Sequence, residues 1–321
     1  MREWTIPAEG EGKRLDRYVA SNMPALKIPL LQKYLRLGRI KRNGKRAKGD
    51  ERLIAGDVLA LYLNDELFDA VPEKKPDPLL SKFRHNVTVL YEDESILLAD
   101  KRPGLIVHPD EEEKVNTLVT HVRAYLYQKG EYDPKGGFSP APCNRIDRFT
   151  GGIVIFAKTQ EALLQMDNLI RERKLRKLYL CIVKGRMQPE EGSLENYLLK
   201  DGKRQTVVNR RMPGAQSACT LYKALAYRDG MSLVECELVT GRTHQIRVQM
   251  AHAGHPLMGD SQYGNAAWNR ETERGAQALF AYKLAFPEEL EGPLAKLSGR
   301  SFAVKRVPFA QKYFPEINIQ G

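Results

Sequence analysis

Apolar residues recur along the first part of this chain with the spacings of a helix and of short strands. Those over 26–35 follow helical spacing and predict a helix that ends at Gly38. The pair Asn43-Gly44, between 39–42 and 45–47, predicts a hairpin with a tight turn. Apolar positions over 57–63 predict a final strand, so these residues indicate a small folded unit.

A second and larger set of periodic segments runs from about residue 85 to the end. The run 153–157 is apolar throughout, as in a buried strand, and Thr159 is a predicted N-cap for the amphipathic helix that follows. Further strands are predicted over 178–183, 217–227 and 231–239. The expected fold class is α+β: a small helix–hairpin domain, then a domain with a mixed, largely antiparallel central sheet flanked by helices.

The segment between these two regions has three prolines and mixed charges. Pro72, Pro76 and Pro78 interrupt any helix or strand there. We therefore expect one domain over 1–66, a linker over 67–84 and a second domain over 85–321.

The composition excludes several classes of protein. A hydrophobic content of 42% is too high for a disordered chain, and no apolar run approaches the length of a membrane span or a signal-peptide core. The cysteines are far apart and lack C-x-x-C spacing, which disfavours a disulfide framework or a zinc ribbon. We expect a cytoplasmic protein without membrane association, in which the thiols are reduced: Cys143, Cys181, Cys219 and Cys236.

The net charge of +11 is concentrated in the first region. Between residues 13 and 64, thirteen Lys and Arg residues stand against four Asp and Glu residues. Bases spread over several elements, with few acids among them, are typical of a surface that binds phosphates. The candidate RNA-binding residues are Arg14, Arg17, Lys33, Arg36, Arg39, Lys41, Arg42, Lys45 and Arg46.

Common nucleotide and metal signatures are absent from the sequence. The segment 38–45 resembles a P-loop, but it has five residues between its glycines and Arg46 in place of Ser or Thr. His252 and His255, with His244 nearby, lack a carboxylate or cysteine that would complete a metal site. We therefore expect neither a metal nor a cofactor.

One segment with candidate chemistry directly precedes the buried strand 153–157. Asp147 stands between Arg145 and Arg148, and Arg145 shares its face if the segment is extended. A carboxylate kept ionised by neighbouring cations is suited to act as a nucleophile or a base. A surface salt bridge is the alternative interpretation.

A second candidate segment begins with Gly241 and Arg242. Thr243 is the predicted N-cap of a helix that carries Ile246 on its apolar side. Bases around a helix start favour anion binding, because free backbone N–H groups add to the side-chain charge. Alternatively, His244 and Gln245 only bind the local backbone.

Both segments resemble the RluA-type family of pseudouridine synthases. The stretch 144–158 follows that family's motif H-R-L-D-R-x-T-S-G-L-L-L-F-A-K, and 241–260 follows G-R-T-H-Q-I-R…G-H-P-x-x-G-D. The stretches 98–108 and 177–180 are similar to its K-P-x-G and K-x-Y segments, so the resemblance spans about 87–286. On Arg14-Leu15-Asp16-Arg17-Tyr18, Gly38 and Asn43-Gly44-Lys45, the first region resembles an S-four-type RNA-binding domain.

The resemblance implies an RNA pseudouridine synthase, an isomerase that needs no cofactor. It implies that Asp147 is the catalytic carboxylate, that Tyr179 stacks on the target base and that Arg242 pairs with Asp147. It also implies that Arg145 fills the gap left by the extruded base. The further substrate-binding candidates are Arg148, Thr243 and Ile246. Whether Asp147 attacks the sugar or removes a proton from it is left open.

The expected partner is structured RNA, with large-subunit ribosomal RNA as the preferred interpretation. The protein is expected to be a monomer. The alternatives are a synthase directed at tRNA and a non-catalytic RNA-binding or ribosome-assembly protein that keeps the fold. A hydrolase that releases the base is a weaker option. The presence of Asp147, Tyr179 and Arg242 argues against the non-catalytic reading.

The sequence departs from the family's motifs at several positions. Asn144 replaces His, Phe149 replaces Asp, Gly151 stands where Ser is common, and Phe280 stands where His is usual. None of these residues is assigned to catalysis, so their effect concerns the placement of the substrate.

Overall fold

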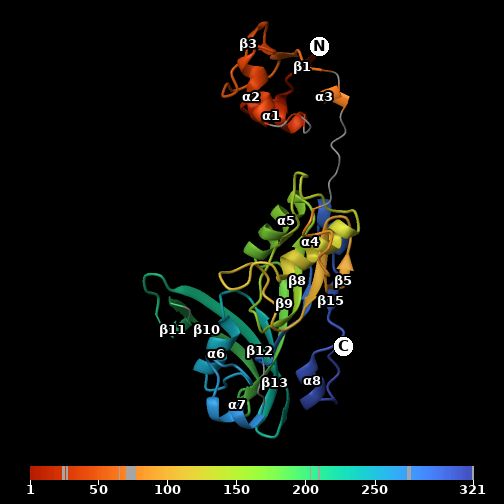
Figure 1. Cartoon of the computed structure of the whole chain (residues 1–321). Helices are drawn as coiled ribbons and strands as arrows, with labels where there is room; N and C mark the ends of the chain where they lie inside the picture. The colour runs from red at the N-terminus through yellow and green to blue at the C-terminus, as the bar shows by residue number, and fades with distance from the viewer. Residues whose placement is uncertain are drawn as a thin grey trace. The chain divides into compact units, whose positions relative to one another are not determined.

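The computed structural model of the chain describes residues 1–23, 26, 28–64, 66–69, 77–202, 204–208, 210–272 and 276–319 (Figure 1). The chain forms two compact units, Met1–Pro76 and Asp77–Gly321. Within the described residues, no helix combines the length and the apolar character that a membrane crossing requires.

The first unit is a four-stranded antiparallel sheet with short helices. The sheet has the order β1-β4-β2-β3. The predicted hairpin turn is confirmed, because Asn43 and Gly44 both have positive φ, 48° and 76°, as a primed turn requires. Gly38, with φ 67°, follows the second helix as predicted. The elements are β1 (Arg2–Thr5), a 3-10 helix η1 (Ala8–Gly10), α1 (Leu15–Asn22), α2 (Ile28–Arg36), β2 (Ile40–Arg42), β3 (Lys45–Arg46), β4 (Val58–Leu61) and α3 (Glu66–Asp69).

The linker predicted over 67–84 is longer than the structure allows. At one end, Leu67 and Phe68 of α3 pack against the core of the first unit. At the other end Leu80 is buried, and the side-chain amide of Gln128 donates to the carbonyls of Leu80 and Phe83, at 2.8 and 2.9 Å. Apolar side chains therefore tie both ends of this segment to a unit, whereas 70–76 lies outside the described residues.

The second unit is built on one large sheet. Its strand order is β11-β10-β12-β13-β9-β14-β8-β6-β5, and β14–β8 is the parallel pair, which confirms the predicted mixed and mainly antiparallel sheet. The elements are β5 (Thr88–Glu92), β6 (Ile96–Lys101), α4 (Leu118–Gln128), β7 (Ala141–Pro142), β8 (Gly151–Ala157), α5 (Gln160–Arg171), β9 (Arg176–Lys184), β10 (Glu191–Asp201), β11 (Arg204–Val208), β12 (Gln216–Arg228), β13 (Met231–Leu238), α6 (Gln245–His252), α7 (Ala266–Thr272), β14 (Leu279–Ala285), a 3-10 helix η2 (Gly292–Leu297), β15 (Ser301–Ala303) and α8 (Pro308–Tyr313).

The large sheet divides the core of the second unit into two layers, and the side chains of β9 alternate between them. Leu178 and Leu180 belong to the layer that includes α5. Tyr179 and Cys181 point to the opposite face, where α4 and α6 pack. Helix α5 begins as predicted, because the Oγ1 of Thr159 accepts the backbone N–H of Ala162 at 3.1 Å. The alternation along β9 therefore places Tyr179 on the α6 side of the sheet.

Two glycines permit β14 to lie directly against β8. Gly151 is paired with Phe280, and a Cβ added at Gly151 would overlap the Phe280 ring. Gly152, with φ +109°, is paired with Ala281, whose carbonyl leaves no space for a Cβ. Two departures from the family's motifs thus form one contact: the large ring of Phe280 occupies the space that a side chain at position 151 needs.

We expect Gly151→Ser to lower the free energy of unfolding by about 1–3 kcal/mol, because an added side chain overpacks the Phe280 ring. The double variant Gly151→Ser/Phe280→His should be more stable than Gly151→Ser, since the smaller ring leaves more space. Urea denaturation measures both. Gly137→Ser is the matched control: a Cβ there meets no atom within 4 Å, so its stability should stay close to wild type. Additive effects at positions 151 and 280 would contradict the coupling.

Candidate active site

A cavity of about 580 Å³ lies in the second unit, between the 143–150 loop, β9 and the start of α6. Its lining includes six bases: Arg145, Arg171, Arg173, Lys177, Arg242 and Arg247. Among the described residues that line it, Asp147 is the only acid. The cavity therefore surrounds one carboxylate with positive charge, which suits a polyanionic substrate.

The structure brings together six of the seven predicted catalytic and substrate-binding residues. Those that line the cavity are Arg145, Asp147, Tyr179, Arg242, Thr243 and Ile246. Arg148 is the exception. Its guanidinium lies 3.4 Å from the Gly104 carbonyl and 3.4 Å from the Glu112 carboxylate. A turn closed by the Thr150 N–H and the Asp147 carbonyl, at 3.1 Å, directs Arg148 away from the cavity.

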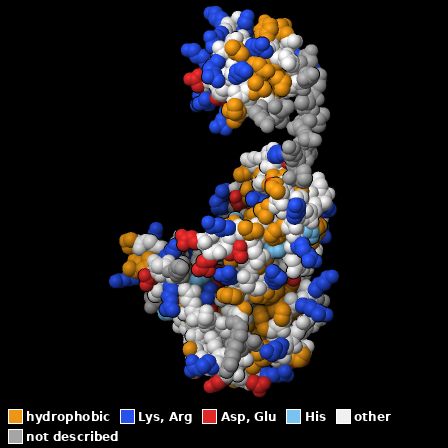
Figure 2. Space-filling model, viewed as in Figure 1, with side chains coloured by type: hydrophobic (Ala, Val, Ile, Leu, Met, Phe, Trp, Pro, Cys, Tyr) orange, Lys and Arg blue, Asp and Glu red, His pale blue; other side chains and the backbone are white. Residues whose placement is uncertain are grey.

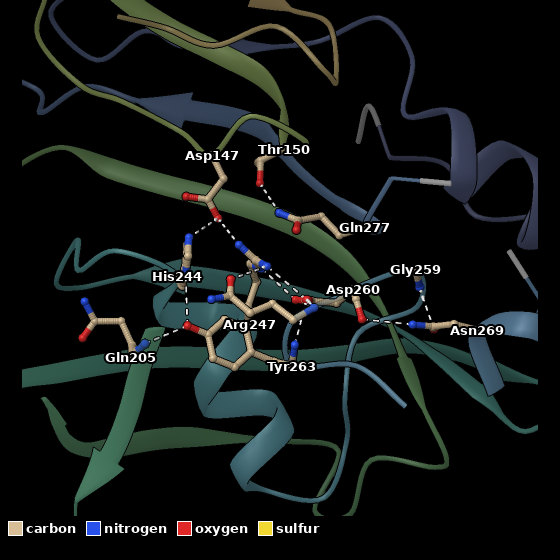
Figure 3. Close-up of polar contacts among 11 residues, drawn as sticks. Asp147, Thr150, Gln205, His244, Arg247, Gly259, Asp260, Tyr263, Asn269 and Gln277 are labelled. Atoms are coloured by element: carbon tan, nitrogen blue, oxygen red, sulfur yellow. Dashed lines mark hydrogen bonds and ion pairs between the residues drawn. The ribbon is translucent and has the colours of Figure 1, made fainter. Parts of the chain in front are cut away.

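The carboxylate of Asp147 pairs with Arg247, and the predicted pairing with Arg242 is wrong. Nη1 of Arg247 lies 2.9 Å from Oδ2 of Asp147. Arg242 precedes α6, and its Nε donates instead to the carbonyl of Ser217 at 3.2 Å. Arg247 lies in the first turn of α6, and Figure 3 shows it directed at Asp147. Both arginines belong to the same motif, so the sequence alone does not distinguish them.

A second carboxylate holds Arg247 in place (Figure 3). Asp260 accepts from Nε and Nη2 of Arg247 at 2.7 and 3.0 Å, and both side chains are almost fully buried. Burial acts to raise the pKa of Asp260. The hydrogen bonds and charge of Arg247, with the backbone N–H groups of Tyr263 and Gln262, outweigh it and lower the pKa below its usual value. The guanidinium is thus fixed before any substrate arrives.

We expect the stability of the second unit to depend on the ionised form of Asp260. Its pKa is lower in the folded chain than in the unfolded one, where it is about 4. The stabilisation is therefore complete above that value and is lost as the pH falls through the folded-state pKa. Urea denaturation between pH 7 and pH 3 measures this. Asp260→Asn should have a flatter pH dependence than wild type, and parallel curves for the two proteins would contradict the assignment.

Helix α6 begins one residue later than the sequence predicts. Its N-cap is His244, in the left-handed conformation with φ 56°, and not Thr243. The backbone N–H of Arg242 donates to Oε1 of Gln245 at 3.0 Å, so the glutamine side chain binds the segment before the helix, and the N-cap itself makes no side-chain hydrogen bond. The sharp turn at His244 brings both its ring and Arg247 toward Asp147 (Figure 3).

The protonation of His244 follows from its neighbours. The hydroxyl oxygen of Tyr263 accepts the backbone N–H of Gln205 at 2.8 Å and lies 3.0 Å from Nδ1 of His244. Burial is the main cause that lowers the pKa of His244, so the ring is neutral at pH 7. On the other side of the ring, Nε2 of His244 lies 3.8 Å from Oδ2 of Asp147. This contact connects β11 to the carboxylate.

The wall of the cavity next to Asp147 is aromatic and aliphatic. Tyr179 and Ile246 are buried, and Leu279 lies beside them in the lining. Burial and the nearby charge of Asp147 raise the pKa of Tyr179, so the phenol stays protonated at neutral pH. Because Tyr179 lines the same cavity as Asp147, a flat ring that lies against Tyr179 is close to the Asp147 carboxylate.

Lys101 is a site residue that the sequence analysis did not single out. Its side chain is fully buried, and Nζ donates to the carbonyls of Leu105 and Arg148 at 2.7 and 3.0 Å. Burial lowers the pKa of Lys101 to about 7, although Asp147 and Asp100 oppose the shift. The lysine thus fixes the turn that follows Asp147. The lysine of the family's K-P-x-G segment could have indicated Lys101. Its hydrogen-bond partners, however, are backbone carbonyls, which a pattern of side chains does not reveal.

Asn144 and Phe149, which depart from the family's motif, have different surroundings. Oδ1 of Asn144 accepts the backbone N–H of Ile155 at 2.8 Å, so this residue ties the loop to β8. Phe149 is 49% exposed and does not line the cavity. At the end of the loop, the buried hydroxyl of Thr150 accepts from the side-chain amide of Gln277 at 2.8 Å.

The predicted RNA-binding bases of the first unit fall into two groups. Three are bound by the protein itself: Arg14 pairs with Asp16 at 2.8 Å, Arg42 pairs with the buried Asp57 at 2.6 Å, and Arg46 donates to carbonyls at the end of α2. For Arg42 and Arg46 the structural bonds compete with a direct role in RNA binding. The other six bases have no such bond among the described residues: Arg17, Lys33, Arg36, Arg39, Lys41 and Lys45.

Aromatic rings lie beside two bases of this second group. The guanidinium of Arg39 lies 5.5 Å from the ring centroid of Tyr34, and Nζ of Lys41 lies 5.2 Å from that of the exposed Tyr62. Figure 2 shows Lys and Arg side chains over much of the visible face of this unit, with few acids among them. Such a surface offers charge for phosphates and rings for bases.

Comparison with known protein sequences gives a consistent result. A family model described as RNA pseudouridylate synthase matches residues 95–252. An uncharacterised RNA pseudouridine synthase of Mycoplasma genitalium is 31% identical over 294 residues, which cover 89% of this chain and 89% of that protein. The ribosomal large subunit pseudouridine synthase D of Neisseria meningitidis serogroup A is 30% identical over 298 residues, 90% of this chain and 75% of that protein.

Solved structures show the same fold. Human RNA pseudouridylate synthase domain containing 1 superposes with a TM-score of 0.56 at 20% identity, over 71% of this chain and 86% of that one. Human RNA pseudouridylate synthase domain containing 4 gives a TM-score of 0.55 at 21% identity, over 69% and 89%. The pseudouridine synthase fold expected from the resemblance is confirmed.

Proposed function

This chain belongs to the RNA pseudouridine synthases, which are isomerases that act on RNA, and on that basis we propose that it modifies uridines of large-subunit ribosomal RNA with Asp147 as its catalytic carboxylate. The observation that carries the proposal is the composition of the cavity. Asp147 is the one acid among the described lining residues, and it pairs with a fixed guanidinium in a cavity that Tyr179 also lines.

The reaction requires little more than these groups. The bond between C1′ of the ribose and N1 of uracil breaks, the base rotates, and a bond between C1′ and C5 replaces it, while C5 loses its proton and N1 gains one. Asp147 either attacks C1′ or removes a proton from the neighbouring carbon. The target must leave the RNA stack for this to happen. We assign base stacking to Tyr179, and we assign the filling of the vacated space to Arg145.

Ribosomal RNA is the proposed substrate because a relative that aligns with 90% of this chain is named as a large-subunit synthase. We further propose that the first unit is an S-four-type RNA-binding domain, which its exposed bases and paired aromatic rings support. We place the enzyme in the cytoplasm, since all four cysteines are free thiols, which suits a reducing compartment. We further propose that it acts as a monomer.

The test is to incubate the purified chain with unmodified transcripts of large-subunit ribosomal RNA and of tRNA, and to map pseudouridine in each. Conversion of a few defined uridines in the large-subunit transcript is expected. Conversion in tRNA alone would overturn the substrate assignment, and no conversion in either RNA would overturn the enzymatic one. Release of free uracil would identify a hydrolase instead. Mapping total RNA from a strain that lacks the gene provides the matching test in cells.

A further inference from the structure

Lys177 is a cation of the cavity wall that has no partner of opposite charge among the described residues. Lys177 is half-buried in β9, and no hydrogen bond or ion pair of its ammonium occurs among the described residues. Burial lowers the pKa of Lys177, and no carboxylate of the described part of the chain offsets the loss of water. A half-buried charge without a partner costs folding free energy, which indicates that its partner belongs to a ligand.

The strand geometry places this ammonium beside the site of the reaction. Lys177 and Tyr179 are two positions apart, so their side chains project from the same face of β9, about 6.6 Å apart along the strand. Nζ of Lys177 lies over the segment before α6, where a Cβ at Gly241 would be 3.8 Å from it. Tyr179 and Lys177 thus form one wall of the cavity, with an aromatic ring at depth and a cation nearer the rim.

We propose that Lys177 binds a phosphodiester of the RNA next to the flipped uridine. The inference rests on the proposed function and adds a phosphate subsite to it. The phosphates of a nucleotide whose base lies on Tyr179 are within one nucleotide length of that base. The separation of Lys177 and Tyr179 along β9 is of the same size. Arg173 and Arg242 also line the cavity and supply further positive charge for the anion.

A structural role explains Lys177 less well. A lysine that stabilised the fold would need an acceptor, as Lys101 has in three carbonyls. Lys177 has none among the described residues, so Lys177→Met should leave the stability unchanged or raise it, while substrate use falls. This combination separates a ligand-binding residue from a residue that only supports the site.

The test uses an RNA stem-loop that contains the uridine mapped with the wild-type enzyme. Turnover by wild type is the first requirement, and its absence would count against the proposed function rather than against Lys177. With an active wild type, Lys177→Met should lower kcat/KM by roughly tenfold to hundredfold, the effect of losing a charge-assisted hydrogen bond. Lys177→Arg should restore most of it. Lys174→Met is the matched control: Lys174 pairs with Glu172 at 2.8 Å outside the cavity, so its loss should have little effect.

Neutral phosphates show which group Lys177 binds. A methylphosphonate is placed on the 5′ or on the 3′ side of the target uridine in two separate RNAs. If Lys177 contacts one of these phosphates, that RNA should react poorly with wild type, and Lys177→Met should add little further loss. Fully additive losses with both RNAs would overturn the proposal and assign Lys177 to the base. A Lys177→Met enzyme with kcat/KM within twofold of wild type would overturn it as well.

Discussion

Asp147→Asn should reduce the rate of pseudouridine formation by about 10⁴-fold or more while RNA binding stays within a few-fold of wild type. The amide keeps the shape of the side chain and can still accept from Nη1 of Arg247. It cannot attack the sugar or take its proton, because both steps need the electron pair of a carboxylate. Single-turnover assays at saturating enzyme separate the chemical step from binding.

Glu112→Gln provides the matched control for this experiment. Glu112 is an exposed acid that pairs with Arg148 at 3.4 Å, and it does not line the cavity. Its loss removes one negative charge close to the 143–150 loop without altering the reacting groups, so the rate should stay near wild type. Substantial activity in Asp147→Asn would show that another group carries the reaction. A parallel loss of RNA binding would leave a structural role as the better explanation.

The elements that local physics determines could be predicted from the sequence. The N-cap at Thr159, the turn at Asn43-Gly44 and the buried strand 153–157 depend on residues a few positions apart, and all three occur in the structure. Most residues that line the cavity could be predicted from the resemblance, since the family's motifs have a fixed spacing. Only Arg148 turned away, because a tight turn inside the motif reverses its direction.

What could not be predicted depends on contacts between distant parts of the chain. Arg247 reaches Asp147 from the helix that begins after the left-handed His244, and no local pattern requires that conformation in a histidine. Gly151 and Phe280 look like separate departures in the sequence, but they meet across β8 and β14. The predicted linker is too long for a similar reason, because its end depends on a tertiary contact. Leu80 lies near three prolines in sequence, yet it is buried in the second unit.

The ion pairs of Arg247 lead to the second large effect. Arg247→Met leaves Asp260 buried without its cation, so the free energy of unfolding should fall by about 3–5 kcal/mol. Pseudouridine formation should fall as well, since Asp147 loses the group that orients it. Arg242→Met should keep nearly all of the stability, because Arg242 pairs with no carboxylate among the described residues and donates only to a carbonyl. Equal stability losses in the two variants would contradict the assignment of the buried pair to Arg247.

A double variant separates the two functions of Arg247. In Arg247→Met/Asp260→Asn the buried negative charge is gone, so part of the lost stability should return. The activity should not return, because Asp147 still lacks the guanidinium at 2.9 Å. Urea denaturation and single-turnover rates, measured on the same preparations below the unfolding transition, give both quantities. Recovery of activity together with stability would show that Arg247 serves only the fold. Recovery of stability alone would show that the same guanidinium binds Asp260 to hold the fold and Asp147 to support the reaction.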